Sequence, residues 1–374
     1  MFTRSLQSVI ENRLHQKKAI ILIGARQVGK STLFDNIVKQ IQLPTLTLNC
    51  DEPETRQILT DINSKELALL IGKNKVVVID EAQRVDNIGM TLKLITDNFP
   101  DIQLLATGSS SFELRNRLNE PLTGRKYEYT LYPTSTEELM HDKGLLYVKQ
   151  TLDSRLLYGS YPDVLNNPDN AKEILMNLAS SYLYKDILEH EGIRRPELIN
   201  KLLIALALQV GSEVSYNELA KTISTDNKTI ERYIDMLEKC YVIFRLPAFS
   251  RNLRTELRKS KKIYFYDNGI RNAIIQNFAP LAMRQDVGAL WENFFISERI
   301  KRNHYNGSYA QSYFWRTTRQ QEVDYIEIEN GEISAFEMKW NPNKKGTPLP
   351  KTFEETYSPK QSIVVTPENF YEWV

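Results

Sequence analysis

Residues 24–31 read G-A-R-Q-V-G-K-S and match the pattern G-x-x-x-x-G-K-[ST] at every fixed position. The apolar run 19–23 before them predicts a buried parallel strand, and a helical pattern follows from Thr32 to about Ile41. Glycines in such a turn let backbone N–H groups curl around an anion, and the helix amino terminus adds partial positive charge. The sequence therefore predicts a phosphate-binding loop between a strand and a helix.

This loop predicts a site for ATP with Mg²⁺. Lys30 is expected to reach the β- and γ-phosphates, and the Ser31 hydroxyl is expected to ligate Mg²⁺. A glycine turn that arose by chance is the alternative interpretation, and the expected strand and helix on either side count against it. The residues expected to contact the nucleotide are Gly24, Ala25, Arg26, Gln27, Val28, Gly29, Lys30, Ser31 and Thr32.

A second motif, K-V-V-V-I-D-E at 75–81, is an apolar strand that ends in two acids. This is a Walker B pattern. The carboxyl end of the strand would direct Asp80 at the Mg²⁺ ion, and Glu81 would polarise the attacking water. The alternative is a strand that simply ends in a polar loop.

Two further positions resemble functional residues of the AAA+ ATPases. The expected strand 102–106 is followed by T-G-S-S-S, which resembles the sensor-1 position, with Thr107 or Ser109 in that role. Arg125 lies just before the expected strand 126–131 and resembles the arginine finger, which neutralises transition-state charge at a neighbouring subunit's nucleotide. That resemblance implies a homo-oligomer such as a ring, whereas the alternative for Arg125 is a surface or salt-bridged arginine.

The whole of residues 1–135 is thus expected to be an α/β domain of the AAA+ P-loop type. Five strands alternate with helices, which predicts a parallel sheet with helices on both faces and the nucleotide at the carboxyl ends of the strands.

Residues 136–250 are expected to be helical and to end in a winged helix. The stretch 197–246 reads as three helices and a short strand, a pattern typical of a helix-turn-helix with a wing. Its helix near 227–239 carries equal numbers of basic and acidic residues, a poor footprint for phosphates, so an AAA+ lid or a subunit-packing module is the alternative. A stronger candidate for nucleic-acid contact, or else a solvated face, is the basic set Arg251, Arg254, Arg258, Lys259, Lys261 and Lys262, against the single acid Glu256.

The hairpin 321–340 predicts a second site. Its turn, Asn330-Gly331, is a strong two-residue type I′ signal, and a two-residue turn fixes the register of the two strands. That register places Asp324 across from Glu337, with Cβ atoms about 5 Å apart. By the same register Glu322 lies across from Lys339.

Two carboxylates held opposite each other repel unless a cation or a proton lies between them. A divalent metal, Mg²⁺ or alternatively Mn²⁺, is the simple remedy, and Lys339 would orient a water or stabilise an anionic transition state. A salt-linked cluster without cleavage and a surface hairpin with scattered charges are the alternatives.

The pattern Asp324 … Glu337-x-Lys339 resembles the PD-(D/E)XK nuclease motif, with Val323 where that family often has proline. Glu292 resembles the acid on the first helix of that family, and the expected αβββαβ order over residues 251–374 matches its core. The resemblance implies that Glu292, Asp324 and Glu337 bind metal and that Glu337 and Lys339 serve catalysis.

Nearly the whole chain resembles a large prokaryotic family of AAA+ ATPases with a C-terminal nuclease-like domain. The resemblance includes I-D-E-A-Q at 79–83, G-S-Y-P at 159–162 and W-E-N-F-F at 291–295. It implies an ATPase whose nucleotide state is coupled to a domain that acts on nucleic acid. The rivals are an ATPase with an inactive nucleic-acid or protein-binding scaffold, and a nucleotide-gated DNA-binding switch.

The composition indicates the class of protein and the compartment to expect. The 374 residues are 41% hydrophobic and 25% charged, with a net charge of +1, which is ordinary for a soluble globular protein and gives no global attraction to nucleic acid or membrane. We expect a cytoplasmic protein without a membrane segment or signal peptide, because the apolar runs are too short. The two cysteines lack a metal-ligand pattern, which argues against a disulfide framework or a zinc site.

Overall fold

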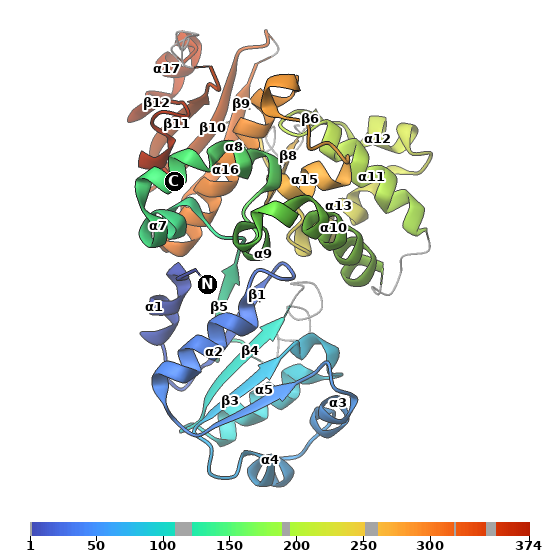
Figure 1. Cartoon of the computed structure of the whole chain (residues 1–374), viewed down its shortest axis with the longest axis vertical. Helices are drawn as coiled ribbons and strands as arrows, with labels where there is room; N and C mark the ends of the chain where they lie inside the picture. Colours follow the sequence, from blue (N-terminus) through green and yellow to red (C-terminus); the bar gives the residue numbers. More distant parts are fainter. Residues whose placement is uncertain (1, 109–121, 189–194, 251–260, 318, 342–348) are drawn as a thin grey trace. The chain divides into compact units, whose positions relative to one another are not determined.

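The computed structural model describes residues 2–108, 122–188, 195–250, 261–317, 319–341 and 349–374 (Figure 1). Contacts divide the chain into two compact units. The N-terminal unit comprises Thr3–Tyr132 with Lys239–Tyr241, and the C-terminal unit comprises mainly Pro133–Glu238 and Val242–Val374. The middle and C-terminal segments thus share one unit, and the three-part division at residues 135 and 250 stays a prediction.

The N-terminal unit is built on a five-stranded sheet in which every neighbouring pair is parallel. The strand order is β2-β3-β4-β1-β5, so β1, which leads into the phosphate-binding loop, lies between β4 and β5. This confirms the expected parallel sheet. The strands are β1 (Ala19–Gly24), β2 (Thr45–Asn49), β3 (Val76–Asp80), β4 (Gln103–Gly108) and β5 (Lys126–Leu131).

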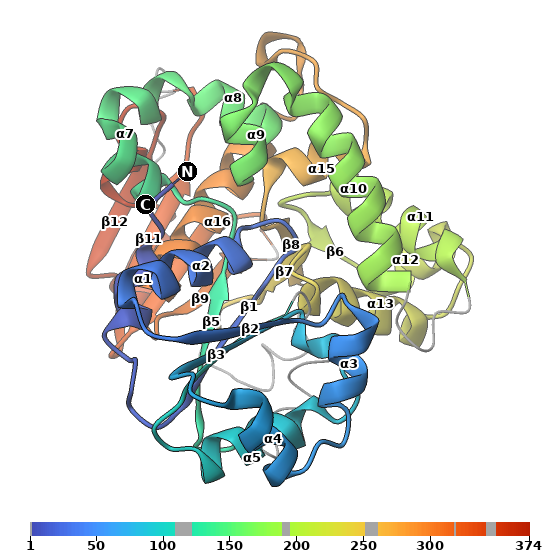
Figure 2. The same cartoon turned by 60° about the horizontal axis from the view of Figure 1, so that its bottom comes forward.

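Helices lie on both sides of this sheet: in Figure 2, α1 and α2 lie on one side and α4 and α5 on the other. Two short helices follow β2 and not one long one, because Thr60 ends the first and the Asn63 side chain caps the second in a capping box with Glu66. The helices are α1 (Ser5–Glu11), α2 (Lys30–Ile41), α3 (Pro53–Leu59), α4 (Ser64–Ile71) and α5 (Ile88–Asn98).

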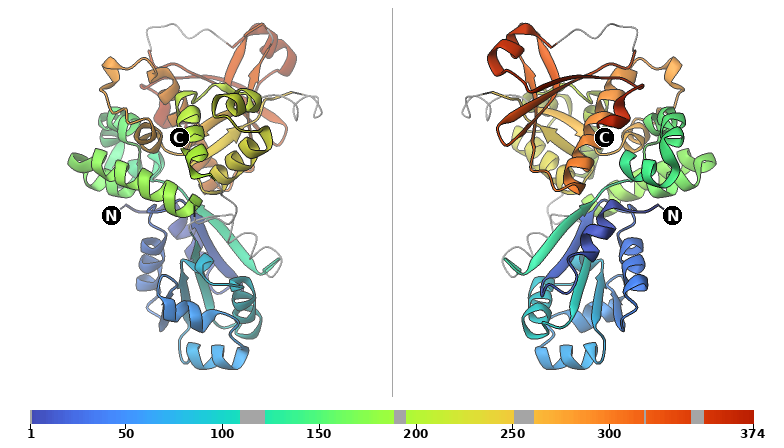
Figure 3. Two further views of the ribbon diagram at one scale, coloured as in Figure 1. Left: turned by 90° about the vertical axis from the view of Figure 1, so that its right-hand side faces the viewer. Right: turned by 90° about the vertical axis from the view of Figure 1, so that its left-hand side faces the viewer.

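The C-terminal unit begins with helices and a small antiparallel sheet of order β6-β8-β7. Both units can be followed from two sides in Figure 3. Three of the helices and the strand β7 occur in the order expected for 197–246. The elements are α7 (Thr136–Gln150), α8 (Leu152–Tyr158), α9 (Pro162–Asn166), α10 (Ala171–Leu188), α11 (Pro196–Leu208), β6 (Glu213–Val214), α12 (Tyr216–Thr222), α13 (Asn227–Lys239), β7 (Ile243–Leu246), β8 (Lys261–Phe265) and α15 (Asn268–Ile274).

The last part of this unit follows the expected αβββαβ order and forms a sheet of order β12-β11-β10-β9. Strand β12 pairs in parallel with β11, and the other neighbouring pairs are antiparallel. Trp315 and Phe353 belong to a buried cluster between this sheet and α17, while Phe295 of α16 contacts Phe336. The elements are α16 (Val287–Tyr305), β9 (Gln311–Arg316), β10 (Glu322–Glu329), β11 (Glu332–Met338), α17 (Lys351–Tyr357) and β12 (Gln361–Val365).

A buried charge network joins α16 to α7 and α8. The Glu298 carboxylate accepts a 2.5 Å hydrogen bond from the backbone N–H of Thr136, the first residue of α7. Lys301 lies 2.6 Å and Arg155 of α8 lies 3.6 Å from its two oxygens, and all three charged side chains are at most 2% exposed. Burial raises the pKa of Glu298, but Lys301 and Arg155 outweigh it and hold the pKa below its usual value.

Both cysteines, Cys50 and Cys240, are buried, and neither belongs to a disulfide. Burial, reinforced by the nearby Asp80 carboxylate, raises the pKa of Cys50 to about 12. Within the described ranges, none of the helices is both long and apolar enough to cross a bilayer.

Candidate functional site

The two fixed glycines of the phosphate-binding loop are required by its geometry. Gly24 has a φ of 148°, and a Cβ atom there would lie 2.1 Å from the carbonyl oxygen of Leu131 at the end of β5. Gly29 has a φ of 95° and directly precedes the first turn of α2. Only glycine adopts such backbone angles without strain, so the loop depends on both residues.

Lys30 and Ser31 open α2 and face the carboxyl end of the sheet. The Lys30 ammonium is 5% exposed and donates hydrogen bonds of 3.0 and 2.8 Å to the carbonyl oxygens of Gly24 and Ala25. The Ser31 hydroxyl lies 2.9 Å from both carboxylate oxygens of Asp80. Because hard oxygen donors of this kind suit Mg²⁺, the Ser31–Asp80 pair fits the expected ion.

Thr107 connects the ends of β3 and β4 beside Asp80. Its hydroxyl donates to the Asp80 carboxylate and accepts a 3.0 Å hydrogen bond from the backbone N–H of Glu81. Glu81 has a φ of 53°, and its carboxylate accepts a 2.5 Å hydrogen bond from Gln83. The structure thus brings Asp80, Glu81 and Thr107 together, whereas Ser109 lies outside the described residues.

Arg4, which was not among the predicted site residues, supports the phosphate-binding loop. Its guanidinium donates to the carbonyl oxygens of Val28, at 2.6 Å, and Tyr132, at 2.5 Å, and its side chain is buried. Arg4 therefore ties the phosphate-binding loop to the end of β5. A single arginine near the chain start offered no pattern from which this contact could be predicted.

Arg125 lies at the opposite edge of the sheet from Lys30. It directly precedes β5, and its carbonyl oxygen accepts a 2.9 Å hydrogen bond from the N–H of Ala19 at the start of β1. Its side chain, 42% exposed, forms a 2.6 Å ion pair with Asp97 of α5. From this edge Arg125 does not reach the loop of its own chain, so a catalytic role requires a neighbouring copy.

The second site is the end of the hairpin formed by β10 and β11. The pairs Ile328–Ile333, Ile326–Ala335 and Tyr325–Phe336 confirm the predicted register. Asp324 lies one residue beyond the last pair, where the pairing of β10 with β9 shifts register between Val323 and Ile326. Such an irregularity changes the direction of side chains, so the simple alternation expected for Asp324 does not extend through it.

Asp324, Glu337 and Lys339 lie close enough for their charges to act on one another. The Asp324 carboxylate accepts a 2.9 Å hydrogen bond from the N–H of Met338, and the Lys339 ammonium lies 2.5 Å from Glu337. Glu322 was expected across from Lys339 by the same register, but the paired residues of β10 and β11 end at Tyr325–Phe336. The Glu322 carboxylate forms ion pairs with Lys262 at 2.5 Å and with Arg316 at 3.7 Å.

Lys262 was expected in a solvated or nucleic-acid-binding basic run, and this expectation is wrong. It lies on β8 and is 2% exposed, and its ammonium lies 3.0 Å from Glu292 and 2.5 Å from Glu322. The Tyr264 hydroxyl, two residues along the same strand, donates to Glu292 at 2.6 Å. The alternation of Lys262 and Tyr264 on one strand face was the signal that could have indicated a shared buried partner.

The donors at this site do not fit a metal ion in the observed arrangement. Among the described residues, no three His, Cys, Asp or Glu side chains are gathered as a metal would need. The carboxylates instead contact protein cations and hydrogen-bond donors, namely Lys262, Lys339, Tyr264 and the N–H of Met338.

Burial shifts the ionisation of the paired acids. It raises the pKa of Asp324 well above its usual range, and the charges of Glu292 and Glu337 add to the effect, with Lys262 and the N–H of Met338 opposing it. Burial likewise raises the pKa of Glu337. The hydrogen bond and charge of Lys339 oppose this shift, and repulsion from Glu292 adds to it. At least one proton is therefore retained by this pair at a pH where exposed carboxylates have lost theirs.

This shift predicts the pH dependence of an Asp324→Asn variant. Between the unfolded pKa and the raised folded pKa, the folded wild type holds more protons than the unfolded chain, so its stability falls as pH rises. The asparagine cannot ionise, so we expect it to be more stable than the wild type at neutral pH, with the difference shrinking toward pH 4. Urea unfolding at several pH values, followed by tryptophan fluorescence, checks this; parallel curves would contradict it.

The surface expected to contact nucleic acid is described only in part. Residues 251–260, which hold most of its basic side chains, lie outside the described residues. On α13, two of the acids are already paired with Arg245 of β7, Asp235 at 2.6 Å and Glu238 at 2.8 Å. Because Arg245 lies outside α13 and neutralises two of its acids, the helix presents a more positive charge than the equal count of its acidic and basic residues indicates.

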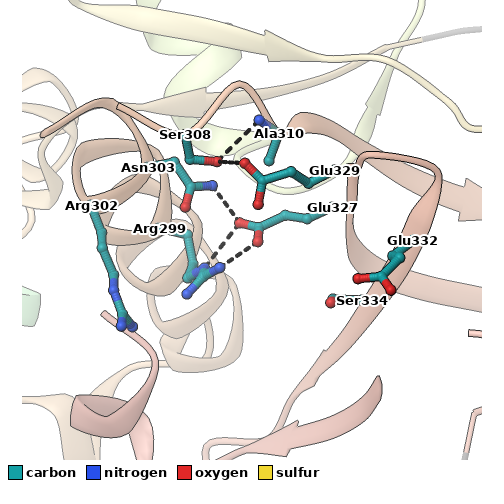
Figure 4. Close-up of a pocket in the computed structure, with 9 residues that line it drawn as sticks. All are labelled: Arg299, Arg302, Asn303, Ser308, Ala310, Glu327, Glu329, Glu332 and Ser334. Atoms are coloured by element: carbon teal, nitrogen blue, oxygen red, sulfur yellow. Dashed lines mark hydrogen bonds and ion pairs between the residues drawn. The ribbon is translucent and has the colours of Figure 1, made fainter. Parts of the chain in front are cut away.

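A separate polar pocket of about 270 Å³ lies between α16 and the hairpin (Figure 4). Glu327 accepts hydrogen bonds from Arg299 at 2.9 Å and from Asn303 at 2.7 Å, and Ser308 donates to Glu329 at 2.8 Å. None of the residues that line this pocket is a predicted site residue. The polar side chains of Arg299, Asn303 and Ser308 form hydrogen bonds with the glutamates of the pocket.

Three segments of the chain match known families. Residues 16–140 match the AAA domain, residues 149–281 match a domain of unknown function (DUF8612), and residues 287–373 match another domain of unknown function (DUF4143). With the loop geometry and the parallel sheet, the first match identifies an AAA-type P-loop ATPase domain in the N-terminal unit.

Uncharacterized proteins of other organisms match most of this chain and about three quarters of their own length. An uncharacterized protein of Mycobacterium tuberculosis is 27% identical over 346 residues, covering 90% of this chain and 73% of that protein. An uncharacterized protein of Methanocaldococcus jannaschii is 25% identical over 346 residues, covering 87% and 75%. Among solved structures, the RuvB Holliday junction branch migration motor of Thermotoga maritima aligns with a TM-score of 0.35 and 16% identity, covering 69% of this chain and 95% of that one.

Proposed function

We propose that the protein binds ATP with Mg²⁺ and hydrolyses it at the carboxyl edge of the five-stranded sheet. The observation that carries this proposal is the convergence of Lys30, Ser31, Asp80 and Glu81 from two elements distant in the sequence. Ser31 and Asp80 hold the ion, which neutralises phosphate charge when bound. Lys30 contacts the β- and γ-phosphates, and the remaining loop residues wrap them with backbone N–H groups.

In this proposal Glu81 orients and deprotonates the attacking water. Thr107 holds Asp80 and Glu81 in position through its two hydrogen bonds. The hydrogen bond from Gln83 fixes the Glu81 carboxylate. Comparison of ATP turnover by the wild type and Lys30→Ala tests the proposal.

We also propose that Arg125 acts on the nucleotide of a neighbouring copy, which makes the working form a homo-oligomer such as a ring. The position of Arg125 at the edge opposite its own loop supports this, since only another chain can bring a phosphate there. Its ion pair with Asp97 would have to open for that contact.

For the C-terminal unit we propose action on nucleic acid, with Glu292, Asp324 and Glu337 as the carboxylates and Lys339 as the cation of a nuclease-like site. The proximity of Asp324, Glu337 and Lys339 supports cleavage, which would need Mg²⁺ or Mn²⁺; because the carboxylates as observed contact protein cations, they would have to rearrange to hold that ion. The pairing of Glu292 and Glu322 with Lys262 favours the alternative, a non-cleaving scaffold. A winged helix formed by α11–α13 with β6–β8 would bind the nucleic acid in either case, with ATP controlling access if the protein is a nucleotide-gated switch.

Cleavage separates these two functions. We expect the wild type to cut single- or double-stranded DNA or RNA in the presence of Mn²⁺, and we expect Asp324→Ala to lower the rate at least about 100-fold. Equal background from both proteins would remove the nuclease function and leave the scaffold. A mobility shift of the same nucleic acids, with and without ATP at two salt concentrations, then reports binding alone.

A further inference from the structure

The backbone of the phosphate-binding loop is held at Val28. The residues on either side of it, Gln27 and Gly29, have φ values of 59° and 95°. A left-handed backbone at a residue other than glycine needs support from its surroundings, and the 2.6 Å hydrogen bond from Arg4 to the Val28 carbonyl oxygen supplies it. Because the C=O and N–H of a planar trans peptide point in opposite directions, the Gly29 N–H points away from Arg4. Arg4 thereby orients one of the N–H groups proposed to bind phosphate.

The end of β5 holds this loop at two places. The Tyr132 carbonyl oxygen, directly after the strand, accepts a 2.5 Å hydrogen bond from Arg4. The Leu131 carbonyl oxygen lies so close to Gly24 that a Cβ atom there would be 2.1 Å from it. A shift of the strand end would therefore displace both Arg4 and Gly24, so the shape of the loop depends on where the strand end lies.

A segment distant in the sequence packs on this strand end. Lys239–Tyr241 belong to the N-terminal unit, although the residues on either side of them belong to the C-terminal unit. The rings of Tyr241 and Tyr132 meet edge to face, with centroids 6.3 Å apart and an interplanar angle of 82°, a geometry that aromatic pairs prefer. The Tyr241 hydroxyl lies 3.4 Å from that of Thr130 of β5. Both tyrosines are less than 10% exposed, so the contact is buried.

The chain passes between its two units next to these same residues. It enters the N-terminal unit between residues 2 and 3, leaves it between residues 132 and 133, and returns to it at 239–241. Arg4, Tyr132 and Tyr241 each lie at one of these passages or within two residues of it. The contacts that hold the phosphate-binding loop are therefore made by residues that connect the two units.

We propose that the segment Lys239–Tyr241 completes the nucleotide site, with Tyr241 as a positioning residue for ATP. The ring of Tyr241 fixes the end of β5, and Arg4 transmits that position to the backbone of the loop. The segment that matches the AAA domain, residues 16–140, contains neither of these two residues and so does not hold the whole site. This inference rests on the nucleotide site proposed above, but it concerns the geometry of the loop and not hydrolysis.

Replacing Tyr241 by asparagine tests the proposal, because asparagine tolerates the φ of 58° at this position and lacks the ring. We expect Tyr241→Asn to bind ATP at least about fivefold more weakly than the wild type in calorimetric titration of the full chain with Mg²⁺. Tyr241→Phe keeps the ring and should bind ATP like the wild type. The matched control is Tyr127→Ala, which removes a tyrosine from the start of the same strand, where its ring contacts Arg13 and Lys18. It should also bind ATP like the wild type.

A double variant tests whether Tyr241 acts through Arg4. Arg4→Lys loses the planar fork that donates to two carbonyl oxygens, so we expect it to weaken ATP binding as well. Because both substitutions loosen the same strand end, the loss of affinity in Tyr241→Asn with Arg4→Lys should be smaller than the product of the two single losses. A double loss equal to that product, or equal ATP affinity for Tyr241→Asn and the wild type, would overturn the proposal.

Hydrogen exchange of the full chain without nucleotide separates this inference from the proposed hydrolysis. We expect faster exchange in the peptides that cover the loop and the first turn of α2 for Tyr241→Asn, but not for Tyr127→Ala. Unchanged exchange there would overturn the inference. A wild type that binds no ATP would remove the proposed function alone, because the exchange comparison needs no nucleotide. If Tyr241→Asn does not fold, Tyr241→Leu, which keeps an apolar side chain without the ring, takes its place in both measurements.

Discussion

Replacement of Lys30 by alanine is expected to lower the rate of ATP hydrolysis by at least about 100-fold, because it removes a buried ammonium that the carbonyl oxygens of the loop hold in place. A donor fixed before the reaction costs little reorganisation as charge develops on the phosphates. Steady-state phosphate release at saturating ATP and Mg²⁺ measures the effect.

Lys39 is the matched control for this variant. It lies exposed in the last turn of the same helix, α2, so Lys39→Ala changes the same charge on the same element without touching the loop. We expect wild-type turnover for Lys39→Ala. Unchanged turnover in Lys30→Ala would show that this lysine does not contact the phosphates in the way we propose.

The same variant also tests Arg125. Arg125→Ala alone should hydrolyse ATP slowly if the arginine serves a neighbouring copy. When inactive Lys30→Ala and Arg125→Ala chains are mixed, some interfaces combine an intact loop with an intact arginine, so activity should reappear. If the mixture stays as inactive as its components, the arginine does not act between subunits.

Replacement of Glu298 by alanine is expected to destabilise the C-terminal unit by about 3–5 kcal/mol. The change leaves Arg155 and Lys301 buried without their shared carboxylate and removes the acceptor for the Thr136 N–H. Glu298→Gln keeps an acceptor but not the charge, so its effect should be smaller. Urea unfolding followed by tryptophan fluorescence isolates this unit, because all four tryptophans (Trp291, Trp315, Trp340 and Trp373) lie within it.

An exposed ion pair provides the comparison. Glu332 lies 2.7 Å from Lys360, and both side chains are more than half exposed. Surface pairs of this kind contribute about 0–1 kcal/mol, so Glu332→Ala should unfold close to the wild type. Equal losses for Glu298→Ala and Glu332→Ala would mean that the buried network does not stabilise the unit as argued.

Features fixed by neighbouring residues could be predicted from the sequence. The loop glycines, the strand 75–81 and the type I′ turn at Asn330-Gly331 each depend on residues close in the chain, and β1, β3 and the hairpin register agree with the predictions. The proximity of Asp80 and Ser31 could also be predicted, because both follow the carboxyl ends of strands and these ends lie at one edge of a parallel sheet.

Features that depend on distant contacts could not be predicted. Arg4 meets Tyr132 across 128 residues, and Glu298 meets Thr136 across 162. In the sequence Lys262 looked like one member of a basic run. In the fold it is buried against Glu292, a residue 30 positions further along the chain. The register shift beside Asp324 depends on the third strand, β9, which the hairpin alone does not reveal.

The burial of the two native thiols makes selective dye labelling of the protein practical. Because Cys50 and Cys240 are both buried, and because the raised pKa of Cys50 keeps it protonated, maleimide reagents would modify them slowly in the folded chain. Single cysteines introduced on exposed helices of each unit would therefore accept fluorescent dyes selectively. Energy transfer between such a pair would report whether ATP changes the separation of the two units, without first rebuilding the protein free of cysteine.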